Sequence, residues 1–140
     1  MKRHPVLVPL SREHHDSLIL AQLLKKDAPA YKGLPTDPST KSVYALHKFN
    51  SVLKDHFAKE EAMLEKANHF HAEIQGLARD IIREHNVLAK LFLQLDQSSD
   101  LIGAMDTLGH LLEEHIRKEE RILFPLIQKY VPEETLMTIA

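Results

Sequence analysis

A repeated arrangement of histidines and glutamates constrains this chain more than any other feature of its sequence. The triplet Arg-Glu-His at residues 12–14 recurs at residues 83–85, and the segment DHFAKEEAML at residues 55–64 recurs as EHIRKEERIL at residues 114–123. Each half therefore supplies one lone histidine and, further along, a histidine followed four residues later by a glutamate. If the halves pack together, four imidazoles and two carboxylates meet, which is a donor set suited to two metal ions.

Composition favours an all-α fold. The chain has 140 residues with only 4 glycines, which argues against a turn-rich β protein, and its 44% hydrophobic and 27% charged content is typical of globular domains. No Gly/Ser-rich linker or abrupt change of composition divides it. We therefore expect a single domain over residues 1–140.

Charge and cysteine content narrow the function classes. The formal net charge is -2, and the chain has no long basic block, so we expect neither nucleic acid nor an anionic membrane as a partner. No apolar run approaches the roughly 20 residues that cross a bilayer, and the first ten residues lack the apolar stretch of a signal peptide, so we expect a cytoplasmic protein. Because there is no cysteine but there are 10 histidines, a bound metal would take nitrogen and oxygen donors.

Apolar periodicity predicts four helices, at residues 11–27, 39–67, 71–97 and 99–131, with the tail from residue 133 forming a further turn. The expected N-caps are Ser11, then Ser39 or Thr40, and a serine or aspartate near residue 99. Pro125 is expected to kink the last helix without ending it. Short connections predict an antiparallel, up-down-up-down four-helix bundle with a two-metal site in its core.

Six polar residues interrupt the apolar faces of these helices. The inward stripe of the second helix is predicted to run through Leu46, Phe49, Leu53, His56, Glu60 and Met63. That of the fourth helix is predicted to run through Leu101, Met105, Leu108, Leu112, His115, Glu119, Ile122 and Leu126. Single histidines interrupt the first and third helices in the same way. The candidate metal ligands are therefore His14, His56, Glu60, His85, His115 and Glu119.

Burial of these six groups without compensation would undo the fold. An unpaired buried imidazole costs about 1 to 3 kcal/mol and a buried carboxylate more, against a total stability of about 5 to 15 kcal/mol. Two divalent cations would compensate them, and six protein donors shared by two ions leave coordination positions open to small molecules. The alternative at this point is a duplicated surface salt-bridge pattern, because a single His-x-x-x-Glu is common on amphipathic helices.

The remaining polar and aromatic residues are assigned more ordinary roles. His15 competes with His14 for the site in the first helix, and the repeat together with the phase of the apolar positions favours His14. Glu61 and Glu120 are expected to face solvent or to pair with lysine or arginine beside the site. The other residues considered are expected at the surface (His4, His47, His69, His71, His110), in ordinary packing (Tyr44, Tyr130) or in a dry wall around the metals (Phe49, Phe57, Phe92, Phe124).

With these residues assembled, the chain resembles the hemerythrin-like family, also called the HHE cation-binding domain, over essentially its whole length. The resemblance rests on Glu13-His14, on His56 with Glu60, on Glu84-His85, and on His115 to Glu120 followed by Leu123-Phe124-Pro125. It implies an antiparallel four-helix bundle with a non-haem di-iron centre. Members of this family bind oxygen, sense oxygen or redox state, sense iron, or handle nitric oxide.

Two departures from the oxygen-carrying members of that family bear on function. The carriers have a second histidine four residues after the ligand of the third helix, where this chain has Ala89. They also place an aspartate five residues after the last histidine, whereas Glu119 comes four residues after His115. Reversible oxygen carriage depends on a protected, asymmetric site, so we do not expect it here.

The expected function is therefore that of a metal-binding or sensing protein rather than a dedicated enzyme. Two iron ions (Fe2+ or Fe3+), with an oxo or hydroxo bridge as one form, would bind oxygen, peroxide or nitric oxide. The alternatives are a di-iron redox enzyme that reduces peroxide or oxygen or oxidises ferrous iron, and an iron storage or delivery protein. Zinc and manganese are the alternative metals. A sensor without an output module needs a protein partner, and the sequence leaves the oligomeric state open.

Overall fold

The structure is a computed structural model, and it describes residues 2–139, which contain helices and no strand. The α-helices are α1 (Val8–Leu24), α2 (Pro38–Lys48), α3 (Lys54–Ala67), α4 (Ala72–Leu93), α5 (Leu101–Lys118), α6 (Phe124–Tyr130) and α7 (Glu133–Leu136). Two π-helical turns, η1 (Phe49–Leu53) and η4 (Glu119–Leu123), and two 3-10 turns, η2 (Asn68–Phe70) and η3 (Leu95–Gln97), complete the elements. The all-α prediction is confirmed. Among the residues described, no helix combines the length and the apolar character that a membrane span requires.

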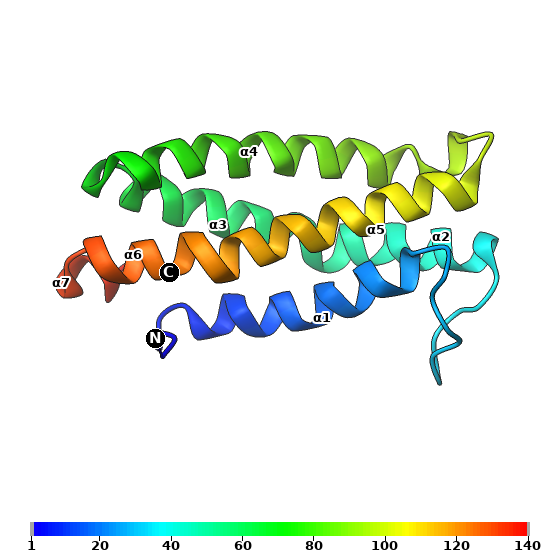
Figure 1. The fold of residues 1–140 in the computed structure, drawn as a ribbon, viewed down its shortest axis with the longest axis horizontal. Helices are drawn as coiled ribbons and strands as arrows, with labels where there is room; N and C mark the ends of the chain where they lie inside the picture. Colours follow the sequence, from blue (N-terminus) through cyan, green and yellow to red (C-terminus); the bar gives the residue numbers. More distant parts are fainter. Residues whose placement is uncertain (1, 140) are drawn as a thin grey trace.

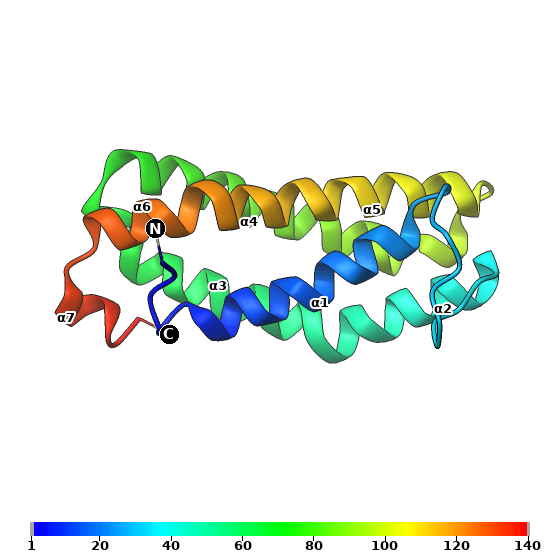
Figure 2. The same ribbon diagram turned by 60° about the horizontal axis from the view of Figure 1, so that its bottom comes forward.

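Four long helical segments lie side by side along the molecule (Figures 1 and 2), an arrangement consistent with a four-helix bundle. Because η1 joins α2 directly to α3, and η4 joins α5 directly to α6, each of these sets forms one continuous segment; α1 and α4 are the other two. α1 contacts α5 most extensively, while α4 contacts both α3 and α5. A candidate ligand on the inner side of one segment can therefore lie close to the candidate ligands of the other segments.

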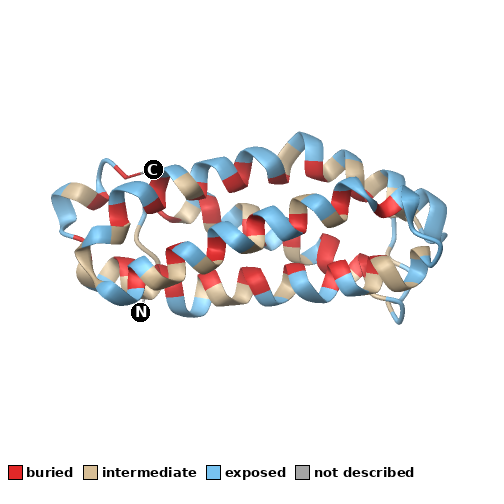
Figure 3. Cartoon of the chain, turned by 90° about the horizontal axis from the view of Figure 1, so that it is seen from above, coloured by how far each residue is buried: buried red, intermediate tan, exposed pale blue. Residues whose placement is uncertain are grey.

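The hydrophobic core consists of two clusters along the length of these helices. Buried positions recur along every long segment (Figure 3). One cluster contains Leu20, Leu53, Leu88, Leu112 and their neighbours. The other contains Leu10, Met63, Ile81, Leu123 and their neighbours. On each segment the candidate ligands come between a residue of one cluster and a residue of the other, so apolar packing closes the site on both sides.

The first helix begins and ends earlier than predicted, and the expectation that Ser11 caps it was wrong. Leu7 occupies the N-cap position, Pro9 lies in the first turn, and the Ser11 hydroxyl instead donates to Glu120 Oε2 at 2.8 Å. At the other end, the backbone N–H of Lys26 donates to Asp106 and the Lys25 ammonium donates to Glu113, at 3.0 and 2.8 Å. These contacts with α5 hold the chain in the direction it takes after Leu24.

Other boundaries differ from the prediction because of local caps. Asp37, rather than Ser39 or Thr40, caps α2 by accepting the backbone N–H of Thr40, so the helix begins at Pro38. The expected aspartate cap of the last long segment is Asp100, and α5 therefore begins at Leu101 rather than 99. α4 runs from Ala72 to Leu93 rather than over residues 71–97, because the chain tightens into η3.

The π turns change which residues face the core. The prediction that Ile122 lies inward was wrong: Ile122 is 49% exposed, whereas Leu123 is fully buried. In η4 the backbone N–H of Phe124 donates to the carbonyl of Glu119, five residues back, and this wider turn advances the inner face by one residue. The turn precedes Pro125, which has no N–H for a regular α-helical bond, and the helix continues to Tyr130 as expected.

Gly109 permits the close approach of α1 and α5. A Cβ built on Gly109 would lie 2.6 Å from the carbonyl oxygen of Ala21 and 3.2 Å from Cβ of Leu24. We expect Gly109→Ala to lower the free energy of unfolding by about 1 to 3 kcal/mol, because α1 must move away from its partner. Chemical denaturation followed by circular dichroism measures this change.

Gly76 provides the matched control within α4. A Cβ built there meets no atom within 4 Å. Gly76→Ala should therefore stabilise the protein by about 0.5 to 1 kcal/mol, the ordinary helix-propensity gain. Equal effects of the two substitutions would show that the α1–α5 approach is not limited by residue 109.

Candidate metal centre

The structure brings all six predicted ligand residues together in the interior. Each is at most 2% exposed, and they come from α1, α3, α4, α5 and η4. His15, the rival of His14, lies on the exposed side of α1. Buried histidines and glutamates at one level of a helical core are the feature that needs a chemical explanation.

Glu60 lies at the centre of the cluster. Its Oε2 atom is 3.0 Å from Nε2 of His14 and 3.1 Å from Nε2 of His56, and its Oε1 atom is 3.1 Å from Nε2 of His85. Glu119 Oε1 lies 2.6 Å from Nε2 of His115. All four histidines therefore present Nε2 to the two buried carboxylates.

The donors form two groups that share Glu60. One group is His14, His56 and Glu60, and the other is Glu60, His85, His115 and Glu119; within each group the ligand atoms lie within 4.8 Å of one another. Some of the Nε2 atoms lie within hydrogen-bond distance of a carboxylate oxygen, but the angles do not suit a hydrogen bond. Among residues 2–139, no hydrogen-bond partner is found for Nε2 of His56, Nε2 of His115 or either oxygen of Glu119. Buried polar atoms without partners are costly, and metal ions would satisfy them. The donor set therefore fits the pair of metal ions that the sequence implies.

An outer glutamate contacts Nδ1 of each histidine. The pairs are His14 with Glu120 at 2.7 Å, His56 with Glu13 at 3.1 Å, His85 with Glu61 at 2.8 Å and His115 with Glu84 at 2.7 Å. A carboxylate that accepts a bond from Nδ1–H fixes the ring orientation and leaves the Nε2 lone pair directed inward. This is the arrangement that metal-bound histidines adopt.

The comparison with protein families agrees with this geometry. A family model described as "Hemerythrin HHE cation binding domain" matches residues 6–127, a span that contains all six donors and all four outer glutamates. The chain belongs to this family. Comparisons with curated proteins and with solved structures give no significant match.

The outer glutamates of this HHE domain follow the internal repeat. Glu13 and Glu84, which precede the lone histidines, reach the histidines of the neighbouring helices α3 and α5. Glu61 and Glu120, which follow the inner glutamates, reach the lone histidines of α4 and α1. The sequence predicted that Glu61 and Glu120 face solvent or pair with lysine or arginine beside the site, and Glu61 is indeed partly exposed while Glu120 pairs with Arg3. It did not predict their contacts with the lone histidines, and it assigned no contact to Glu13 or Glu84. The repeat itself was the available signal, because it duplicates these four residues as well.

The two halves of this HHE domain hold their outer glutamates differently. The carboxylate of Glu120 also accepts bonds from Ser11 and from Arg3, at 2.8 and 3.2 Å, and Lys118 pairs with Glu84. Glu61 has no such second partner among the residues described, and its side chain is 41% exposed. The halves are therefore alike in donors but unequal in the support around them.

Burial and mutual contact set the charges of the metal-free cluster. Burial lowers the pKa of His14, but the carboxylates of Glu120 and Glu60 raise it more, to about 10. Burial likewise lowers the pKa of His115, and Glu119 and Glu84 raise it to about 9. Burial and the nearby charge of Glu60 raise the pKa of Glu119 well above its usual value. Protons therefore occupy the site when cations do not.

Aromatic rings line the site. The ring of Phe57 stacks on His85 with centroids 4.1 Å apart, and Phe124 stacks on His14 at 5.5 Å. Phe49 and Phe92 stack on each other in the core cluster that contains Leu53. Phe57 and Phe124 thus shield the histidines from water, as the sequence predicted for these aromatic residues.

Proposed function

We propose that this HHE-domain protein holds two iron ions and binds or senses oxygen, peroxide or nitric oxide at them. The observation that carries the proposal is the set of four inward Nε2 atoms around two buried carboxylates, with each Nδ1 held by an outer glutamate. The same proposal includes an antiparallel up-down-up-down topology, one domain over residues 1–140, a cytoplasmic location and a protein partner that reads the sensor's state.

The donors divide between the two ions. His14 and His56 would hold one ion, His85, His115 and Glu119 would hold the other, and Glu60 belongs to both groups. A bound iron pair supplies open coordination positions and redox chemistry of one or two electrons. The imidazoles would donate lone pairs to the cations, the two inner carboxylates would offset part of their charge, the outer glutamates fix the rings, and Phe57 and Phe124 limit access of water.

Space beside His85 supports access by a small ligand. A cleft of about 310 Å³ is lined by His85, Phe57, Glu61 and Ala89, among others. Ala89 stands where oxygen carriers of this family have a further histidine, so the side chain that would complete one coordination sphere is only a methyl group. An incomplete sphere next to a cleft favours ligand sensing over reversible carriage.

Peroxide turnover distinguishes the sensor from the enzyme. Iron-loaded protein is mixed with excess hydrogen peroxide, and the absorption spectrum and the remaining peroxide are followed together. The proposal predicts one stoichiometric spectral change per chain with little further consumption. Many turnovers per chain would instead support the redox enzyme, and iron-free protein carrying zinc or manganese after growth in iron would contradict the choice of metal.

Loss of an outer carboxylate should weaken metal binding. We expect Glu84→Gln to lower metal affinity about 10- to 100-fold, because an amide cannot hold Nδ1–H of His115 as a carboxylate does. Competition against a coloured chelator measures the affinity. Glu114→Gln is the matched control, since Glu114 is exposed on α5 directly before His115 and makes no hydrogen bond or ion pair within residues 2–139. Equal affinities of the two variants would refute the role of Glu84.

A further inference from the structure

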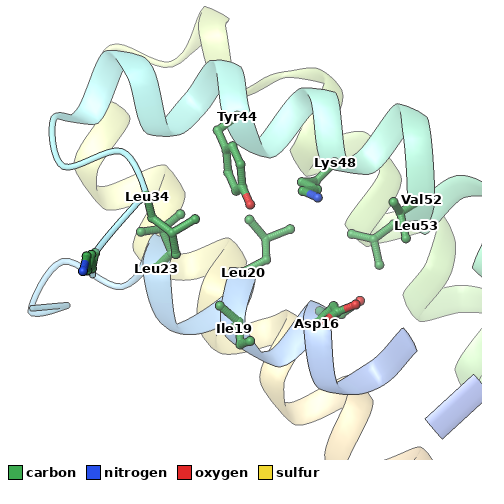
Figure 4. Close-up of a pocket in the computed structure, with 11 residues that line it drawn as sticks. Asp16, Ile19, Leu20, Leu23, Leu34, Tyr44, Lys48, Val52 and Leu53 are labelled. Atoms are coloured by element: carbon green, nitrogen blue, oxygen red, sulfur yellow. The ribbon is translucent and has the colours of Figure 1, made fainter. Parts of the chain in front are cut away.

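A second cavity lies outside the metal centre, between α1, the loop that follows it and the α2–η1 segment. Its volume is about 450 Å³, within the usual range of small-molecule sites. Figure 4 shows the side chains of Leu20, Leu23 and Leu34 along one side and Val52 and Leu53 at the far end. The walls are thus largely apolar.

Charged and polar side chains border this apolar space. Lys48 and Tyr44 project from α2 into the cavity, and Asp16 lies at the edge formed by α1 (Figure 4). Within residues 2–139, the Lys48 ammonium and the Asp16 carboxylate form no ion pair, and the Tyr44 hydroxyl forms no hydrogen bond. Lys48 Nζ lies 5.6 Å from the centre of the Tyr44 ring, which keeps the two side chains together.

The charges around the cavity favour an anion. Lys48 is half-buried in the wall beside Tyr44, whereas Asp16 is exposed at the rim, and Lys32 adds a second positive charge. An ammonium and a hydroxyl that project together from one helix suit a carboxylate, which accepts a hydrogen bond from each. The leucines beyond them suit a short apolar chain.

The local backbone also sets this cavity apart. Lys48 directly precedes the π turn η1, and Val52 and Leu53 lie within it. Unlike η4, this turn has no proline nearby to account for it, and isolated π turns occur frequently at functional sites. The turn brings Val52 and Leu53 to the cavity one helical turn before His56.

We propose that this cavity binds an amphipathic monocarboxylate, with its carboxylate on Lys48 and Tyr44 and its apolar chain along Leu20, Leu23 and Leu34. The proposal does not depend on which metal the HHE centre holds. It adds a binding site for an organic acid to a protein whose family assignment concerns cations alone.

Calorimetric titration of the full chain with octanoate tests the proposal. We expect binding at one site with a Kd below about 1 mM, and at least about tenfold weaker binding of octylamine and of acetate. Acetate tests for a carboxylate bound at the metals, because it lacks the chain. Octanoate that binds no better than acetate, or octylamine that binds better than octanoate, would overturn the proposal.

Two variants separate the head group from the chain. Lys48→Met should lower the affinity for octanoate about tenfold, because the variant lacks the positive charge. The affinity for octanol should stay the same as that of the unaltered protein. Leu34→Trp should fill the cavity and remove binding of both compounds. Lys90→Met, on the exposed side of α4, should leave both affinities unchanged. Octanoate affinity that survives Lys48→Met unchanged, with octanol binding and helicity intact, would overturn the assignment.

Discussion

Glu60→Gln should empty both halves of the metal centre. Glu60 contacts the Nε2 atoms of His14, His56 and His85, and it is the one residue common to both donor groups. An amide of the same shape carries no charge, so it offsets none of the positive charge of the two cations and binds metal more weakly than a carboxylate. We expect affinity to fall more than the roughly 10- to 100-fold that follows loss of an outer partner, and metal content to fall from about two ions per chain to well below one.

The matched control for this variant is Glu65→Gln, an exposed glutamate of the same helix. Both proteins are purified from iron-supplemented cells, and iron is measured by elemental analysis after the circular dichroism spectrum has shown equal helix content. The Glu65 variant should keep its metal. A folded Glu60→Gln protein that retained two ions would show that Glu60 is not shared by them.

Metal affinity should rise steeply with pH, well above the range in which ordinary histidines titrate. The pKa values of His14 and His115 in the metal-free protein are about 10 and about 9, so both rings carry a proton at pH 7. A cation must displace both protons. Each displaced proton contributes a tenfold change per pH unit, so affinity should increase about 100-fold per unit from pH 7 towards pH 9.

Chelator competition with zinc at fixed ionic strength measures this slope, after correction for the chelator's own titration. The stability of the metal-free protein supplies a second readout with the opposite sign. A raised pKa in the fold stabilises it fully below about pH 6.5, the value of an unfolded histidine, and this contribution is lost as pH rises through 9 to 10. Affinity that stopped rising near pH 7 would contradict the carboxylate-bound imidazoles described above.

The burial of the six candidate ligands at one place in the core could be predicted from the sequence because two independent patterns coincide at them. The repeat duplicates each histidine and glutamate, and the apolar periodicity places each of them on an inward face. Burial of His14 but not His15 follows from the same phase. Residues that face the protein core from a regular helix can therefore be predicted from their spacing alone.

The outer glutamates could not be predicted from spacing, because each contacts a histidine on another helix. Whether Glu13 reaches His56 or faces water depends on how α1 sits against α3, and one helix's period carries no such information. Glu61 is partly exposed and Glu120 pairs with Arg3, as the sequence predicted, but the contacts of these two glutamates with His85 and His14 were not predicted. Pairing across helices is set by packing, which only the structure shows.

The π turns explain the differences in which residues of the long segments face the core. A stripe calculated at 3.6 residues per turn places Ile122 inward, whereas the extra residue of η4 brings Leu123 there instead. The same displacement in η1 buries Ala45 rather than Leu46. Pro125 indicates an irregularity next to η4. The sequence of η1 contains no residue that would be out of place in a regular α-helix, so this turn could not be predicted.

Iron stoichiometry of the freshly purified, unaltered protein is the most direct test of the central claim, that the buried histidine–glutamate cluster is a two-metal site. Elemental analysis after expression with ample iron should give close to two irons per chain, as the two donor groups require. A folded protein with no bound transition metal, even after incubation with ferrous iron without oxygen, would contradict it.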